Sequence, residues 1–573
     1  MLTGPVPLPG GLSVAHLAAL VAADVLVRRA RAAGDELRWV ASAFAGGLTT
    51  QRAAEDDLVR EGLDKAMIGR EAFAARMAAS TEAARADLAD AASALRLGFD
   101  VGAAVEAGDA AAHAARTAFV CLFDAGVVHR ADRVVGACPG CATTIGASEA
   151  VPAHLEGEDL TLRLALVDDL DGDGHLDVAC LATELLPGVV AIAVPEGSPA
   201  AGRCALVPLA ASMVPVVADA GVARNTLVVP AHDQAAFELA RRLGLPAVPV
   251  LDDRGFVCAP GPLVGQARYA ARVAARRLLD AERVVLATAD GLEAVERCPA
   301  CRTVLVPLLG THWVLALADL ETAAADAVRD GRLTVWPAGA REDLLAGAGE
   351  AGEWCLSQQV WGGVAVPVGR CLDCGHLDVS VHPATSCGRC MGTLVADVDV
   401  LEERFVRCML PLAVAGWPEA GRGPAERTGG SVLFVVPAAA AADVLPMVAL
   451  GLRLDGAVPF DEVAVLCPPN GAVDGDAGLD LPALAVEEGA ATLRIALASG
   501  GLDLVAARDV VALLEKPPPG HADVRRLASA MDAASAVAPP SFALGLLAAA
   551  AREGVPTADV AKLRALAAPF VGR

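Results

Sequence analysis

The chain has 573 residues, enough for three or four domains, and a formal net charge of −24. This charge argues against a broad electrostatic surface for DNA or RNA and leaves room only for a local basic groove. Hydrophobic residues make up 55% of the chain, and nearly all positive charge is arginine, because the only lysines are Lys65, Lys516 and Lys562.

The predicted elements change character along the chain. Apolar periodicity over residues 13–34 predicts a helix, LRWVASAF (residues 37–44) predicts a short strand, and alanine-rich helices continue to residue 115. From residue 160 a series of strands begins with LTLRLALV and HLDVACLAT, and it precedes the helix ELARRLG (residues 238–244). An α/β pattern returns after residue 301, and a helical tail is expected from residue 517 onward.

The longest apolar run extends from Ser431 to Leu452 and has the length of a membrane helix. It contains Pro437, Asp443 and Pro446, so we expect a buried strand, turn and helix instead. No charged region precedes the first apolar segment, so we expect no signal peptide and a soluble, cytoplasmic protein.

Eight of the fifteen cysteines form four C-x-x-C pairs, a pattern typical of metal sites in a long intracellular chain. CLDCGHLDVSVHPATSCGRC has the spacing of a closed zinc ribbon, in which four thiolates surround one structural ion. The other two pairs lie in ACPGC and RCPAC, and a shared site would join the two ends of a long insertion. The ribbon cysteines are Cys371, Cys374, Cys387 and Cys390, and the distant pairs are Cys138/Cys141 and Cys298/Cys301.

Two further features have a structural and a functional interpretation. The segment RYAARVAARR puts Arg268, Arg272 and Arg276 on one helix face, and we expect a solvated stripe rather than a phosphate site. Cys180 has no adjacent histidine to act as a base, so we expect a buried structural thiol rather than a nucleophile.

Six segments of the chain are informative together: LVRRARAAGDELRWV, REGLDKAMIGREAF, AGVVHRADRVVGACPGC, VVPAHDQAAFELARRLGLPAVPVLDDRG, WCLSQQVWGG and GAATLRIALASG. With these segments the chain resembles valyl-tRNA synthetase, a class I aminoacyl-tRNA synthetase, over about residues 4 to 515. It implies an α/β fold: a Rossmann-type catalytic domain split by a β-rich editing insertion, with zinc at the hinges of the insertion.

The resemblance also implies domain boundaries. The catalytic-like domain would comprise residues 1–137, 311–365 and 396–515, and the editing-like domain residues 149–289. Zinc knuckles would lie at 138–148 and 290–310, a zinc ribbon at 366–395 and a truncated helical tail at 516–573.

Members of this family activate valine with ATP and transfer it to tRNA, but the residues expected for this chemistry are altered here. The H-x-G-H signature, which holds ATP phosphates, is reduced to His16. The K-M-S-K-S signature corresponds to CPPNGAVDGDAGLD (residues 467–480), which has no lysine and three aspartates. Phe44 replaces the acid that grips the amino group of the substrate, and VPAA (residues 436–439) replaces G-Y-D-I.

The editing insertion keeps more of the expected residues. His232 and Asp233 of VVPAHD match the family, whose aspartate binds the amino group of mischarged threonine, and Glu184 matches a glutamate of T-T-R-P-E-T. Leu227 replaces a family lysine, and Cys180 takes the position of a threonine.

Three functions remain open at this point. The chain is a pseudo-synthetase that uses the zinc-locked scaffold for binding, an editing deacylase that acts through Asp233 and Glu184, or a divergent valine–tRNA ligase. The expected metal content is two structural zinc ions, and the lost signatures argue against ATP as a substrate. Expected partners are the acceptor end of tRNA or another protein, but not DNA or a membrane.

Overall fold

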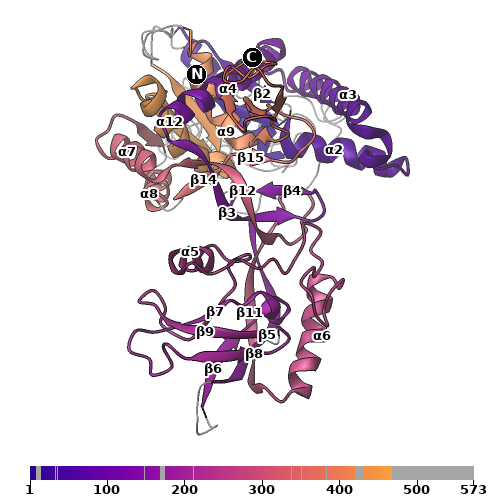
Figure 1. The fold of residues 1–573 in the computed structure, drawn as a ribbon. Coiled ribbons are helices and arrows are strands. Elements are labelled where there is room, and N and C mark those ends of the chain that lie inside the picture. Colours follow the sequence, from indigo (N-terminus) through magenta and orange to yellow (C-terminus); the bar gives the residue numbers. More distant parts are fainter. Residues whose placement is uncertain are drawn as a thin grey trace. The chain divides into compact units, whose positions relative to one another are not determined.

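A computed structural model describes residues 1–466 of the chain except for 8–13, 33, 35, 45, 148, 168–173, 211, 337, 350–351, 383 and 420–430. The chain separates into two compact units (Figure 1). Unit 1 contains residues 1–128, 315–354 and those from 361 onward, and unit 2 contains residues 129–314 and 355–360.

Unit 1 is built on a five-stranded parallel sheet with the strand order β13-β21-β20-β1-β2. The central strands are apolar on both faces, as in parallel sheets covered by helices on both sides: in β20 the side chains of Phe434, Val435 and Val436 are all buried. The strands are β1 (Leu2–Pro7), β2 (Val40–Phe44), β13 (Thr334–Trp336), β20 (Leu433–Pro437) and β21 (Glu462–Leu466).

Alanine-rich helices pack closely within unit 1 because their side chains are small. Helix α4 begins after Asp100, whose carboxylate caps it by accepting from the backbone N–H groups of Gly102 and Ala103, and it buries a stripe of alanines. The α-helices of unit 1 are α1 (Val14–Ala32), α2 (Gly47–Arg60), α3 (Lys65–Ala94), α4 (Val101–Asp124), α7 (Ala318–Arg329), α8 (Ala338–Ala346), α9 (Glu403–Cys408), α10 (Leu410–Val414) and α12 (Val444–Asp455), and the 3₁₀ helix η2 covers Ala438–Asp443.

A small antiparallel sheet, ordered β17-β16-β18, lies in the segment that carries the ribbon cysteines. Its strands are β16 (Val368–Cys371), β17 (Leu377–Val379) and β18 (Leu394–Ala396). Short strands β14 (Glu353–Cys355), β15 (Ser357–Gln358) and β19 (Val400–Leu401) complete this part of the chain.

Unit 2 is rich in β-structure. The long strand β5 pairs antiparallel with β11 and β6, and a four-stranded sheet has the order β10-β7-β9-β8. Buried Leu160, Leu162 and Leu164 alternate along β5 and contribute to the core that these sheets share. The elements are β3 (Val128–Cys138), β4 (Thr143–Ile145), β5 (Val151–Ala165), β6 (His175–Cys180), η1 (Thr183–Gly188), β7 (Ala191–Val194), β8 (Cys204–Val207), β9 (Ser212–Ala218), β10 (Thr226–Val228), α5 (Gln234–Leu243), α6 (Arg268–Ala281), β11 (Val285–Arg297) and β12 (Val306–Ala316).

The predicted α/β class with a parallel sheet is confirmed, as is the buried strand, turn and helix of residues 431–452, which form β20, η2 and α12. Among the residues that the structure describes, the helices are all too short or too polar to cross a membrane. The tail expected at 516–573 and the segment CPPNGAVDGDAGLD lie outside the described residues.

Candidate metal centres and substrate-site segments

The two distant cysteine pairs meet in unit 2. The turn between β3 and β4 carries Cys138 and Cys141, and the turn after β11 carries Cys298 and Cys301. The sulfur atoms of Cys138 and Cys301 lie 3.4 Å apart, and those of Cys141 and Cys298 lie 3.8 Å apart. All four sulfur atoms lie within 4.8 Å of one another, so the group can hold a metal ion.

The ribbon cysteines form a second group in unit 1. Distances of 3.4 Å join the sulfur of Cys390 to those of Cys371 and Cys374, and the sulfurs of Cys374 and Cys387 are 3.8 Å apart. These four sulfur atoms also lie within 4.8 Å of one another. The grouping within each set agrees with the expectation from the spacing of the pairs.

All four C-x-x-C pairs adopt the same turn. The residue after the second cysteine has a positive φ and donates its backbone N–H to the carbonyl oxygen of the first cysteine. A positive φ costs a residue other than glycine about 1–2 kcal/mol. In the three turns that lack glycine at this position, other interactions therefore have to offset this conformational cost. The donors are Ala142 (φ 53°, 2.8 Å), Arg302 (φ 62°, 3.0 Å), Gly375 (φ 70°, 3.0 Å) and Met391 (φ 62°, 2.9 Å).

The geometry fits zinc. Four thiolates at about 2.3 Å from a tetrahedral ion are separated by about 3.8 Å, close to the sulfur distances in both groups. The close approach of the sulfur atoms couples their ionisation: hydrogen bonds from Cys138 and Cys141 lower the pKa of Cys298, and hydrogen bonds from Cys138 and Cys298 raise the pKa of Cys141. A bound divalent cation would supply the charge that lets all four thiols ionise together.

The two groups differ in exposure to solvent. In the unit 2 group, Cys138, Cys141 and Cys298 are buried and Cys301 is half-buried. In the ribbon, both Cys374 and Cys390 are exposed. Access of a competing chelator or an oxidant therefore differs between the two groups.

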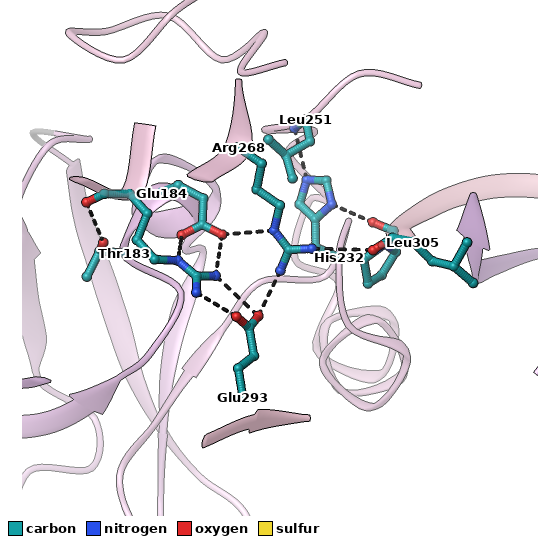
Figure 2. Close-up of polar contacts among 9 residues, drawn as sticks. Thr183, Glu184, His232, Leu251, Arg268, Glu293 and Leu305 are labelled. Carbon is teal, nitrogen blue, oxygen red and sulfur yellow. Dashed lines mark hydrogen bonds and ion pairs between the residues drawn. The ribbon is translucent and has the colours of Figure 1, made fainter. Parts of the chain in front are cut away.

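Glu184 lies in a buried network of four charges in unit 2 (Figure 2). Its carboxylate accepts from Arg268 Nε at 3.0 Å and from Arg272 Nε at 2.7 Å, and the same two guanidinium groups reach Glu293 at 3.0 and 2.5 Å. Burial raises the pKa of Glu184, but Arg272 and Arg268 outweigh this effect and hold the pKa below its ordinary value. The Glu184 side chain has an exposed fraction of 0%, so no side of it is open to a substrate.

The expected solvated arginine stripe is wrong for two of its three members. Arg268 is buried and Arg272 is only 17% exposed, because helix α6 presents them to Glu184 and Glu293. Arg276 extends further along α6 and pairs with Glu158 at 3.1 Å. The period of 3.6 residues identified the face, but sequence alone did not reveal the carboxylates opposite it.

His232 and Asp233 are adjacent in sequence but differ in environment. His232 is buried, its Nε2 accepts from the N–H groups of Val250 and Leu251, and its Nδ1 lies 2.7 Å from the carbonyl oxygen of Pro307. Nε2 accepts and therefore carries no proton, and burial lowers the pKa of His232, so the ring is neutral. It connects the backbone at Pro307 to that at Val250 and Leu251. Asp233 is exposed and caps helix α5 by accepting from the N–H of Ala236 at 2.7 Å.

Cys180 has the predicted structural role. It is 5% exposed at the end of β6, and burial raises the pKa of its thiol to about 12. The thiol is therefore protonated at neutral pH and packs as a core residue.

The catalytic-like residues are only partly described. His16 lies in α1 and Phe44 ends β2, but both side chains lie outside the described part of the structure. VPAA begins at the end of β20 and continues into η2. Phe44 and VPAA thus fall at the carboxyl ends of two strands of one parallel sheet.

An open parallel sheet with helices packed against it defines the doubly wound class of α/β fold. Residues 1–467 match the sequence model of the tRNA synthetases class I (I, L, M and V), and the chain belongs to this family.

Valine–tRNA ligases are among its relatives within this family. The ligase of Streptomyces coelicolor is 31% identical over 481 residues, and that of Desulfotalea psychrophila is 29% identical over 479; each alignment covers 80% of this chain and 53% of the relative. The chain spans about half the length of these curated relatives. A solved LeuRS of Agrobacterium radiobacter K84, in a ternary complex with tRNA and LeuAMS, has a TM-score of 0.46 and 14% identity, and the match covers 100% of this chain and 83% of that one.

The zinc assignment predicts two ions per chain with different lability. A chelator should extract about one ion quickly from the exposed ribbon and a second ion slowly from the buried unit 2 group, as measured by a chromophoric zinc indicator. Cys374→Ser should abolish the fast phase only, and Cys138→Ser the slow phase only. Release of both ions in one phase, or isolation of a folded protein that binds no zinc, would contradict the assignment.

The charge network predicts a large stability effect at Glu184. Glu184→Gln leaves buried guanidinium charge uncompensated and should lower the free energy of unfolding of unit 2 by about 3–5 kcal/mol, measured by urea titration. Asp177→Asn is the matched control in the same unit, because it breaks the exposed pair of Asp177 with Arg163. The control should change the free energy of unfolding little. Equal effects of the two variants would refute the claim that the buried network contributes more to stability than the exposed pair.

The depressed pKa of Glu184 also predicts a pH dependence. A carboxyl whose pKa is lower in the folded state stabilises the fold above its unfolded pKa, near 4.5, and this contribution disappears as pH falls through the folded pKa. Urea midpoints measured from pH 7 downward should therefore fall more steeply below about pH 4.5 for the wild type than for Glu184→Gln. Parallel curves for the two proteins would show that Glu184 does not contribute.

Proposed function

We propose that this member of the family is a valyl-tRNA synthetase-like scaffold, stabilised by two zinc ions, that no longer attaches valine to tRNA. The observation that carries the proposal is a contrast between two sets of residues. Eight cysteines form two complete groups with zinc geometry, whereas no lysine occurs between Lys65 and Lys516 to neutralise ATP phosphates. A chain that has the thiols but lacks these cations fits a binding role better than catalysis.

The physical argument rests on charge in the transition state. Removing one group that stabilises developing charge typically costs about 10²–10³ in rate. The chain lacks the signature lysines, one signature histidine and the acid replaced by Phe44, and these losses together would remove most of the family's rate enhancement.

In this proposal the two zinc groups act as crosslinks at the limits of the domains. The unit 2 group would join residues 138–148 to 290–310 at the base of an editing-like domain, and the ribbon would stabilise residues 366–395. A cytoplasmic location, with the acceptor end of a tRNA or another protein as partner, follows from the family role and is proposed with it.

Asp233 favours a second candidate, the editing deacylase. It is an exposed carboxylate beside His232, in the segment that the family uses to bind the amino group of threonine. Glu184 gives this candidate little support, because both of its oxygens accept from arginine side chains.

ATP–pyrophosphate exchange with valine tests the main proposal. The zinc-loaded protein should exchange at least about a thousandfold more slowly than the Streptomyces coelicolor ligase, given the groups that are lost. Valine-dependent exchange within about tenfold of that ligase would refute the proposal.

Hydrolysis of threonyl-tRNA separates the two candidates. The scaffold should not accelerate it. Acceleration that Asp233→Asn removes would establish editing instead, and asparagine is the preferred substitution because its side-chain oxygen still caps α5.

A further inference from the structure

The parallel sheet of unit 1 defines where a small ligand would bind. The strand order reverses at β1, which has β2 on one side and β20 on the other, and doubly wound folds bind ligands outside the carboxyl ends of the strands at such a point. Helix α2 begins at Gly47 beyond the end of β2, and η2 ends at Asp443 beyond the end of β20. Phe44 and VPAA, the segments that the resemblance assigns to the substrate pocket, lie at these same two strand ends.

Charged side chains of helix α9 reach both positions. On the α2 side, a Cβ placed on Gly47 would lie 2.7 Å from Oε2 of Glu403, so the carboxylate lies against the first residue of that helix. On the η2 side, Arg404 Nε is 2.5 Å from Asp443 Oδ1, and Arg407 Nη2 is 3.3 Å from Asp443 Oδ2. Arg407 Nη1 also lies 3.3 Å from Glu403 Oε1, which joins the two sides into one network.

The network is largely buried. The side chains of Arg404, Asp443 and Glu403 are 9%, 5% and 9% exposed, and that of Arg407 is 26% exposed. These four residues carry two positive and two negative charges, and buried Glu402, which accepts from the backbone N–H of Phe405, is a further acidic group that acts on Arg404. The guanidinium of Arg404 also lies over the ring of Trp354, 5.0 Å from its centroid.

We propose that Glu403, Arg404, Arg407 and Asp443 occupy the small-molecule site of this fold, so that the chain supplies an internal substitute for a zwitterionic amino acid. An amino acid presents an ammonium and a carboxylate, each of which needs an opposite charge in the site. Here the positive and negative groups that would meet such a ligand are already paired with one another inside the chain. The inference rests on the proposed function and adds a physical reason for it, since a site filled in this way cannot admit valine or its adenylate.

The test uses the full zinc-loaded chain and valine as the probe, with binding followed by calorimetry and by the shift of the thermal midpoint. The wild type should not bind valine at millimolar concentration. Arg404→Ala/Asp443→Ala removes one charge of each sign and vacates the space, so valine should bind at least about tenfold more tightly than to the wild type. Arg404→Leu/Asp443→Leu is the matched control, because it removes the same charges but keeps the space filled, and it should not bind.

Valine binding by the wild type would overturn the inference, and so would a folded, zinc-loaded alanine double variant that binds no better than the wild type. If the alanine double variant does not fold, Arg404→Ser/Asp443→Ser is read by the same criterion, because it removes the same two charges and most of the same volume but leaves a polar group at each position. If the alanine double variant gains no affinity for valine and the wild type shows no ATP–pyrophosphate exchange, only the proposal of an internal substitute is refuted. Valine-dependent exchange by the wild type would refute the proposed function as well.

Discussion

Charges in the interior of this chain have to be neutralised within the molecule, because moving an unpaired charge from water into protein costs several kcal/mol. The charged groups of this chain meet the constraint in two ways. Glu184 in unit 2 and Asp443 in unit 1 are each matched by two arginines. The cysteine groups would be matched by a bound ion, because four neighbouring thiols can all be ionised only around a cation.

The same need for charge neutralisation applies to the substrates of the family. A nucleoside triphosphate needs cations in its binding site. The arginines near the carboxyl edge of the unit 1 sheet, Arg404 and Arg407, already form ion pairs with Asp443 and Glu403. The groups that stabilise the fold are complete, while the groups that would stabilise a transition state are missing from the sequence or paired internally. This distribution of charge is the basis on which we propose a binding scaffold.

Local patterns allowed prediction of the parts of the structure that depend on local spacing. Each C-x-x-C pair forms one turn, as its local spacing predicts, and Cys180 is buried as expected because it lies within an apolar strand. The meeting of Cys138 and Cys141 with Cys298 and Cys301, across 157 to 163 residues, is not a local feature and was expected from the number of pairs and from the resemblance. Arg268 and Arg272 were placed on one helix face but were wrongly expected in solvent. Their partner Glu293, and the network around Asp443, join segments 21 to 88 or 36 to 39 residues apart, and no local pattern indicates such pairs.

The most direct measurement is a crystal structure of the zinc-loaded chain grown with a non-hydrolysable valyl-adenylate analogue, with anomalous data collected at the zinc edge. The account predicts two tetrahedral zinc ions, each held by four cysteine sulfurs, an intact pair between Arg404 and Asp443, and no analogue at the carboxyl edge of the parallel sheet. An analogue bound at that edge, with Arg404 and Asp443 separated to admit it, would contradict the account.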